Sequence, residues 1–310
     1  MNGKHIKPPA HPHILSIDVE DYFMVEAFAG SIPRSSWDSW PSRVDANTRR
    51  TLDLLDEHGV KATFFLVGWV AKRFPRLVRD IESRGHELAC HSFWHRTVYS
   101  LTAEEFRQDT RSALRAIEDA TGTKVHGYRA PSWSITKHCL WALDILVEEG
   151  FTYDSSIFPI RHDLYGMPGA QRFPYAHACA NGKFIQEFPA STVRFLGQNF
   201  PGAGGGYLRI FPLAYTQWFF RTFESNYRES VVVYFHPWEL DPEQPRIRDK
   251  FRSRFRHYTN LGVMRDRLDF LLQNYSFTTF GEALASRDGT DSRRLVPCTR
   301  FSRVVHPTLL

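Results

Sequence analysis

Short runs of β-branched and aromatic residues alternate with longer amphipathic stretches along most of the chain. Eight runs have the length and composition of buried strands, namely 14–18, 62–67, 87–90, 125–129, 151–154, 184–188, 231–235 and 277–280. Strands that alternate with helices build parallel βα units. The pattern therefore predicts an α/β fold, a barrel of seven or eight parallel strands that occupies residues 1–285.

Four amphipathic stretches between these strands end in glycine, as helices commonly do, and they are 44–58, 75–84, 102–121 and 137–149. Thr102 and Glu105 have the spacing of a capping box at the start of the third. The pattern weakens over 161–210, where Gly and Pro are frequent, and a long loop insertion is expected there, either a flexible connector or a wall of a substrate cleft. Residues 286–310 lack periodicity and are expected to form a flexible tail.

Reactive side chains recur where the expected strands end. Asp18, Arg129 and Asp154 close the first, fourth and fifth strands, and His91 and His236 directly follow two others. In βα barrels the functional groups stand at the carboxyl ends of the strands. The five side chains are therefore expected on one rim of the barrel.

Composition supports a folded, soluble protein. The chain has 310 residues, 42% of them hydrophobic, which excludes a disordered chain and suffices for a large core. The net charge is +5, and residues 246–256 alone carry six basic side chains against Asp249. This basic segment is either a solvated face or a site for an anionic glycan or a lipid diphosphate. Because no nucleic-acid motif is present, nucleic acid is not an expected partner.

No run approaches the roughly 18 to 20 apolar residues that a membrane-spanning helix needs, so any membrane contact is expected to be peripheral. The first twelve residues contain no apolar stretch of signal-peptide length, which predicts a cytoplasmic protein. The four cysteines at 90, 139, 179 and 298 lie far apart without a C-x-x-C pair and are expected to be reduced. Nothing in the pattern indicates an oligomeric state.

Two histidines four residues apart, His91 and His95, give the sharpest chemical signal. If the chain enters a helical turn there, both rings share a face and can reach one metal ion. By contrast, the His86–Glu87 pair lacks the helical spacing of zinc proteases, because the next histidine is five residues on.

Three carboxylates, Asp18, Glu20 and Asp21, crowd the end of the first strand. Buried together, they would repel one another unless a cation or an arginine compensated their charge. They are either a solvated loop or, with the two histidines on the same rim, part of a metal site with spare carboxylates for proton transfer.

Four segments in order resemble the motifs of the polysaccharide deacetylase family, also called the nodulation-deacetylase homology domain, and they are D-V-E at 18–20, H-S-F-W-H at 91–95, Y-R-A-P-S-W at 128–133 and V-Y-F-H-P at 233–237. The resemblance covers about 14–240. D-V-E-D-Y-F at 18–23, with Y-D-S-S-I-F-P at 153–159 and G-G-G-Y-L-R at 204–209, is similar to the subfamily of bacterial exopolysaccharide and exosortase loci.

The resemblance implies a distorted barrel, a divalent metal, usually zinc, and removal of N-acetyl groups from hexosamine units of a polysaccharide or its lipid-linked precursor. Asp18 matches the catalytic base, and His91 and His95 match metal ligands. Many members have two adjacent aspartates, but Val19 follows Asp18 here. Glu20 is therefore the expected carboxylate ligand, because strand alternation places it on the same side as Asp18. Asp21 is the second choice.

By the same resemblance, Arg129 orients the base and His236 is the general acid. Asp154 matches the carboxylate that tunes His236, and the backbone N–H of Ser132 matches the oxyanion donor.

Trp94, Trp133 and Trp238 lie within three residues of these motifs and are either apolar walls for sugar rings or ordinary rim packing. The alternative functions are a related metal hydrolase acting on O-acetyl esters or cyclic amides, a carbohydrate-binding pseudoenzyme and a structural barrel.

Overall fold

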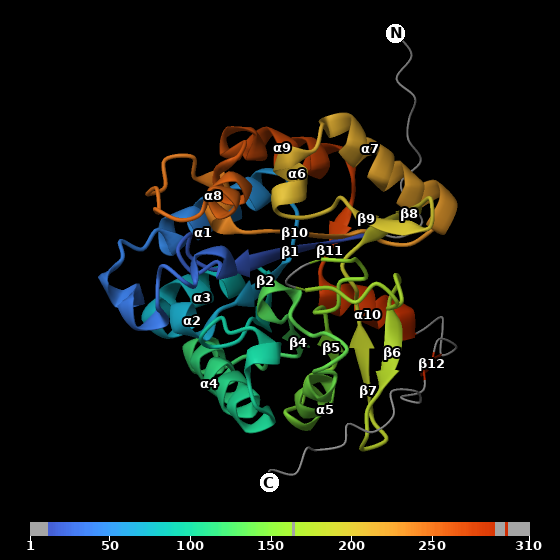
Figure 1. The fold of residues 1–310 in the computed structure, drawn as a ribbon, viewed down its shortest axis with the longest axis horizontal. Helices are drawn as coiled ribbons and strands as arrows, with labels where there is room; N and C mark the ends of the chain where they lie inside the picture. Colours follow the sequence, from blue (N-terminus) through green and yellow to red (C-terminus); the bar gives the residue numbers. More distant parts are fainter. Residues whose placement is uncertain (1–11, 163–164, 289–294, 297–310) are drawn as a thin grey trace.

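The computed structural model describes residues 12–162, 165–288 and 295–296, and within them a curled sheet runs through the centre of the molecule (Figure 1). In order across this sheet the strands are β10 (Val232–Phe235), β1 (His13–Val19), β2 (Thr63–Leu66), β3 (Glu87–Cys90), β4 (Gly127–Tyr128), β5 (Tyr153–Asp154), β7 (Phe184–Glu187), β6 (Tyr175–Ala178) and β12 (Leu295–Val296). A further strand, β11 (Phe277–Thr278), pairs with the start of β1.

Among the described residues, the ladders from β10 to β7 are parallel, and β11 also runs parallel to β1. These eight strands are the eight that the sequence predicts, so the α/β class with seven or eight parallel strands is confirmed. The sheet stays open as a half-barrel, because β6 turns antiparallel against β7 instead of joining β10. A single bridge between Gly204 and Tyr234 extends the other edge.

Ten α-helices surround this sheet in the described residues, and they are α1 (Val44–Glu57), α2 (Gly68–Arg73), α3 (Pro75–Ser83), α4 (Ala103–Thr121), α5 (Trp141–Glu148), α6 (Gly206–Ile210), α7 (Leu213–Thr222), α8 (Phe251–Tyr258), α9 (Met264–Asn274) and α10 (Phe280–Asp288). The Thr102–Glu105 capping box at the start of α4 is present. Figure 1 shows α1 to α5 along one side of the curl and α7 and α9 beyond β10.

Strand alternation divides the core into two layers. Leu15, Ile17 and Val19 of β1 pack in the large cluster that includes the helices, whereas Ile14 faces the interior of the curl. Ser16 and Asp18 share that inner face, where both contact a buried arginine. A small aromatic floor made of Phe65, Tyr153, Phe188 and Phe280 closes the interior below them. The inner face of β1 therefore places Ser16 and Asp18 above a layer of aromatic side chains.

The expected loop over 161–210 contains regular structure. It holds β6, β7 and α6, together with a separate hairpin of β8 (Thr192–Phe195) and β9 (Gln198–Pro201). The two turn residues of that hairpin, Leu196 and Gly197, both have positive φ. Such turns normally carry Asn-Gly or Asp-Gly, so a leucine there gave no turn signal in the sequence.

The expected tail at 286–310 begins inside α10, and 295–296 form β12, while the remaining positions lie outside the described residues. Cys90 and Cys139 are free and buried, Cys179 is also buried, and Cys298 lies outside the described residues. Across the part of the chain that the structure describes, no helix has the length and apolar character needed to cross a membrane.

Candidate active site and metal centre

A pocket of about 410 Å³ opens at the carboxyl ends of the parallel strands. Asp18, near the end of β1, lines it together with Glu20, His91, His95 and His236, which follow the ends of β1, β3 and β10. Of the five residues expected on the rim, Asp18, His91 and His236 line this pocket. Arg129 lies beside them, because it contacts Asp18 directly. Asp154 is the exception.

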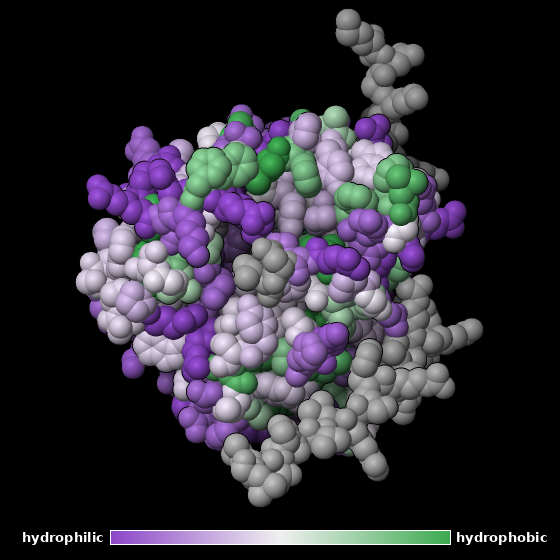
Figure 2. Space-filling model, in the orientation of Figure 1, coloured by the Kyte–Doolittle hydropathy of each residue, from purple (hydrophilic) through white to green (hydrophobic). Residues whose placement is uncertain are grey.

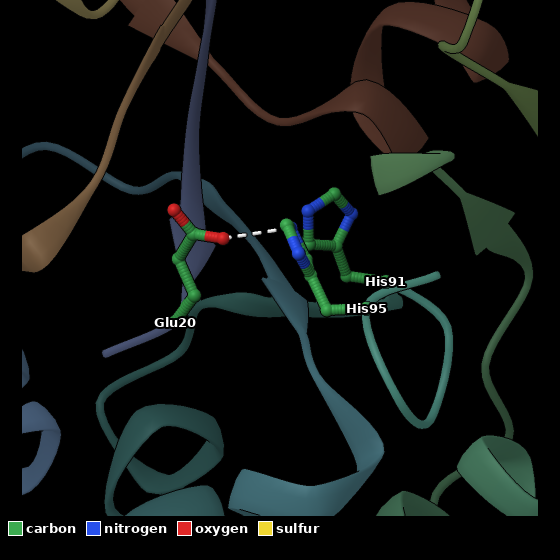
Figure 3. A group of neighbouring side chains, drawn as sticks. All are labelled: Glu20, His91 and His95. Atoms are coloured by element: carbon green, nitrogen blue, oxygen red, sulfur yellow. Dashed lines mark ion pairs between the residues drawn. The ribbon is translucent and has the colours of Figure 1, made fainter. Parts of the chain in front are cut away.

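Glu20, His91 and His95 form a compact buried cluster (Figure 3). One ligand atom from each lies within 4.8 Å of the others, and the three residues are 2%, 2% and 3% exposed. Glu20 Oε2 is 2.7 Å from His95 Nε2. Such a two-histidine, one-carboxylate set leaves coordination positions open for water or substrate.

The donor chemistry of this cluster fits a divalent metal. His91 Nδ1 lies 2.8 Å from the carbonyl oxygen of Arg129, so Nδ1 donates there and Nε2 keeps its lone pair for a metal. Burial lowers the pKa of His91 to about 4, which keeps the ring neutral, as a ligand must be. Within the described chain, His95 Nδ1 is buried without a hydrogen-bond partner.

Glu20 is ionised despite its burial. Desolvation alone would raise the pKa of Glu20, but the charges of His95 and His236 outweigh it and hold that pKa far below its usual range. Trp238 also donates its indole N–H to Glu20 Oε1 at 3.1 Å. The cluster thus supplies an anionic oxygen next to two imidazoles.

The two histidines converge through a loop, so the expected helical turn is absent. Ser92 and His95 both have positive φ, at 64° and 50°. Asp109 of α4 holds this strained segment by accepting from the Ser92 hydroxyl at 2.7 Å and from the N–H groups of the next two residues at 2.7 and 3.1 Å. Arg34 donates to the carbonyl oxygen of His95 at 2.8 Å.

Asp21, the second choice for the carboxylate ligand, turns away from the cluster. Its carboxylate accepts from the Ser42 hydroxyl at 2.6 Å and from the backbone N–H of Val44 at 3.2 Å, where α1 begins. The first N–H groups of a helix lack partners within the helix and attract anions. Asp21 therefore caps α1, and Glu20 is the carboxylate in the cluster.

Arg129 fixes one oxygen of Asp18. Its Nη1 donates to Asp18 Oδ1 at 2.6 Å and to the Ser16 hydroxyl at 2.9 Å, while Nε donates to the carbonyl oxygen of Ser155 at 3.2 Å. The guanidinium is buried and stacks over the Phe65 ring at 4.1 Å. Asp18 Oδ2 is left facing the pocket, 3.9 Å from His236 Nε2.

His236 is held by a carboxylate that the sequence did not indicate. Its Nδ1 lies 2.8 Å from Glu239 Oε1, and Glu239 in turn accepts from Arg209 at 2.5 Å. Burial alone would lower the pKa of His236, but Glu20, Glu239 and Asp18 together raise it to about 9. Burial opposes the ionisation of Glu239, yet Arg209 and His236 lower its pKa to about 2.

Asp154 does not tune His236. Its Cα pairs in register with that of Glu187 on the neighbouring strand, and the two buried carboxyl groups are hydrogen-bonded. Burial raises the pKa of Asp154 to about 6 and that of Glu187 well above its usual value. Neither residue lines the pocket. The predicted Asp154 role is therefore wrong, and Glu239 makes that contact instead.

The tryptophans divide between the two expected uses. Trp133 and Trp238 line the pocket, as does Ser132, whereas Trp94 is 40% exposed and packs against Phe93 outside the pocket lining. Trp238 is stacked between His236 and a second histidine, His257, at ring distances of 5.0 and 4.1 Å. It therefore packs the rim as well as walling the pocket.

Comparison with known proteins agrees with this geometry. A family model described as polysaccharide deacetylase matches residues 35–148. Residues 35–148 belong to the polysaccharide deacetylase family. A second model, described as a domain of unknown function (DUF3473), matches residues 155–285.

The chain resembles several polysaccharide deacetylases over about a third of its length. It is 35% identical over 100 residues to a chitooligosaccharide deacetylase of Sinorhizobium fredii, covering 32% of this chain and 44% of that protein. It is 32% identical over 98 residues to a peptidoglycan-N-acetylglucosamine deacetylase of Bacillus cereus, covering 31% and 36%. The matched segments thus span less than half of these relatives.

Two solved structures show the fold over nearly the whole chain. A candidate polysaccharide deacetylase from Mycobacterium smegmatis has a TM-score of 0.62 at 20% identity, covering 96% of this chain and 99% of that one. An allantoinase has a TM-score of 0.57 at 13% identity, covering 89% and 90%. At these identities the likeness concerns architecture alone.

The pocket draws on both matched segments. The polysaccharide deacetylase segment supplies His91, His95 and Arg129, whereas Glu239 and its partner Arg209 lie in the second. Sequence reasoning missed these last two, although Glu239 stands three residues after His236 in H-P-W-E, a spacing that brings side chains together in a helical turn. Asp109 lay in mid-helix and carried no signal.

Proposed function

We propose that this protein is a divalent-metal-dependent hydrolase that removes N-acetyl groups from hexosamine units of a polysaccharide or its lipid-linked precursor. The observation that carries the proposal is one pocket that holds three groups at once. These are the buried Glu20–His91–His95 cluster, a carboxylate held by arginine, and a histidine with a raised pKa. The relatives that deacetylate chitooligosaccharide and peptidoglycan support the substrate class.

Glu20, His91 and His95 would hold the metal. Two imidazole nitrogens and a carboxylate oxygen are ligands that favour zinc. When bound, such an ion polarises an acyl carbonyl and lowers the pKa of water. The D-V-E-D-Y-F variant of the first motif supports a substrate from exopolysaccharide synthesis.

Asp18 acts as the base. Because Arg129 occupies Oδ1, Oδ2 is the oxygen that accepts the proton of the attacking water. The buried guanidinium also holds the carboxylate in one orientation, so the acceptor lone pair is aimed before the substrate arrives.

His236 acts as the acid. Glu239 holds Nδ1, which leaves Nε2–H directed at the pocket. An amide nitrogen leaves poorly unless it is protonated, so a proton donor separate from the base is required. Ser132 lies in the turn Pro131–Trp133 with a φ of 53°, and it supplies the backbone N–H that stabilises the oxyanion.

The test is acetate release from tetra-N-acetylchitotetraose, measured by mass spectrometry on zinc-loaded protein and on the same protein after chelation. We expect release by the zinc-loaded protein and its loss after chelation. O-acetylated xylan and allantoin serve as ester and cyclic-amide comparators. Turnover of either comparator without release from N-acetylated glycans, whatever their length or lipid linkage, would contradict the proposal, as would the absence of any turnover.

A further inference from the structure

A second hollow adjoins the catalytic pocket and forms a groove with it. Its volume is about 540 Å³, and it shares Glu26, Ala27, Ser253 and Arg256 with the pocket that contains the metal cluster. Figure 2 shows hydrophilic side chains, with apolar ones among them, over α8 beside the hollowed centre of this face. A glycan bound at the metal cluster can therefore extend along α8.

Three cations line this second hollow, namely Lys250, Arg252 and Arg256. All three are exposed, and among the described residues none forms an ion pair with a carboxylate. Some surface arginines elsewhere are paired; for example, Arg107 contacts Glu148 and Glu149 at 2.5 Å each. The cations in the second hollow lack such a carboxylate partner.

The two carboxylates in the hollow are already engaged. Glu26 lies 3.7 Å from Arg34, and Asp249 accepts from the Ser31 hydroxyl and from the Lys250 backbone N–H at 2.5 Å each. Neither carboxylate forms an ion pair with the side chain of Lys250, Arg252 or Arg256. An anion that enters the groove meets a net positive wall.

The helix that carries these cations is tied to the catalytic acid. Arg209, which holds Glu239, also donates from Nη2 to the carbonyl oxygen of Arg256 at 3.2 Å. The cationic wall is consequently fixed relative to His236 and the metal cluster, as a substrate subsite requires.

We propose that the hollow lined by Lys250, Arg252 and Arg256 binds an anionic group of the substrate. This group is either a uronate carboxylate of the glycan or the diphosphate that joins a glycan to its carrier. The inference deepens the proposed function, on which it rests, by assigning the substrate a negative charge close to the deacetylated sugar.

The experiment measures binding by calorimetry to zinc-loaded full-length protein with three probes. Tetragalacturonate represents the carboxylate source, UDP-N-acetylglucosamine the diphosphate source, and tetra-N-acetylchitotetraose the neutral glycan. The test variant is Lys250→Ser/Arg252→Ser. The matched control is Lys72→Ser/Arg76→Ser, which removes two exposed cations that lie outside both hollows.

We expect at least one anionic probe to bind the wild type, with an affinity that falls as salt rises. The test variant should weaken that binding about tenfold, and the control less than about twofold. The probe that is affected identifies the source of the charge. Equal affinities in the two variants, or no binding of either anionic probe, would overturn the proposal, provided that both variants keep the wild-type melting temperature.

Binding needs no turnover, so this outcome is independent of catalysis. A protein that binds the anionic probe through α8 but releases no acetate would contradict the proposed function and leave the subsite standing. A protein that releases acetate, but in which the two variants bind the anionic probes equally well, would support the proposed function and contradict the subsite.

Discussion

Two pairs of buried carboxylates lie at strand ends in this molecule, and their electrostatic surroundings are opposite. Asp18 and Glu20 contact Arg129, His95 and His236, and the pKa of Glu20 lies far below its usual range despite desolvation. The second pair, Asp154 and Glu187, forms no ion pair within the described residues, and burial raises both pKa values. Both pairs lie at strand ends, so the neighbouring cations account for the lowered pKa of Glu20, and burial without an ion pair in the described chain for the raised pKa values of Asp154 and Glu187.

The largest effect is expected from Asp18→Asn, which keeps the shape of the side chain and removes its proton acceptor. Turnover should fall by about 10³-fold, within the range for loss of a general base. The metal content should stay at the wild-type value, because Asp18 is not in the cluster. Acetate release and elemental analysis of the same preparation check both statements. Near-normal turnover would assign the base to another carboxylate.

A somewhat smaller effect is expected from His236→Ala, about 10²-fold on amide substrates. Activated aryl acetates should lose much less, because their leaving groups need no proton. The ratio of the two losses is measured with N-acetylated glycan and aryl acetate on one protein sample. Equal losses on both substrates would indicate that His236 only packs against Trp238.

Glu239→Gln removes the carboxylate that contacts His236. Loss of its negative charge lowers the pKa of His236, so the acid deprotonates at a lower pH and the alkaline limb of the pH–rate profile moves toward neutrality. At neutral pH the rate should fall about tenfold. Asp154→Asn is the matched control and should leave the alkaline limb in place. The opposite pattern would restore Asp154 as the partner of the acid.

The smallest effect concerns stability. The folded-state pKa of Asp154 is raised to about 6 and that of Glu187 further, both above their unfolded values of about 4. The stability that this pair contributes is thus full below about pH 4 and is lost as pH rises through about 6.

Glu187→Gln, which mimics the protonated acid, should flatten this dependence between pH 5 and 8, because one of the two titrating groups is removed. Denaturant melts at the two pH values measure it, and acetate release should be unchanged. An unaltered pH slope would mean that the pair does not hold a proton in the folded state.

Much of the fold could be predicted because strands buried on both faces read as nearly continuous apolar runs, as in β2 and β10. The β8–β9 hairpin could not, since Leu196 at its turn and exposed Phe195 beside it gave neither turn chemistry nor burial. These elements depend on tertiary packing rather than on local pattern.

Strand alternation correctly separated Glu20 from Asp21, and the four-residue spacing of His91 and His95 correctly indicated that the two rings lie close together. The partner of His236 could not be chosen correctly, because side chains at strand ends select partners by the packing of the loops that follow. Asp154 meets the neighbouring strand, whereas Glu239 reaches back to His236 within one short turn, Pro237–Leu240. The Asp154 contact depends on the folded sheet, whereas the spacing in H-P-W-E was a local signal for the Glu239 contact.

Metal content of the purified protein tests the proposed site most directly. The wild type should hold one divalent ion per chain, and His91→Ala/His95→Ala should lose this ion. It should be retained in the matched control His126→Ala/His138→Ala, which removes two exposed histidines. Stoichiometric metal in the His91→Ala/His95→Ala variant would contradict the assignment of the site and the chemistry built on it.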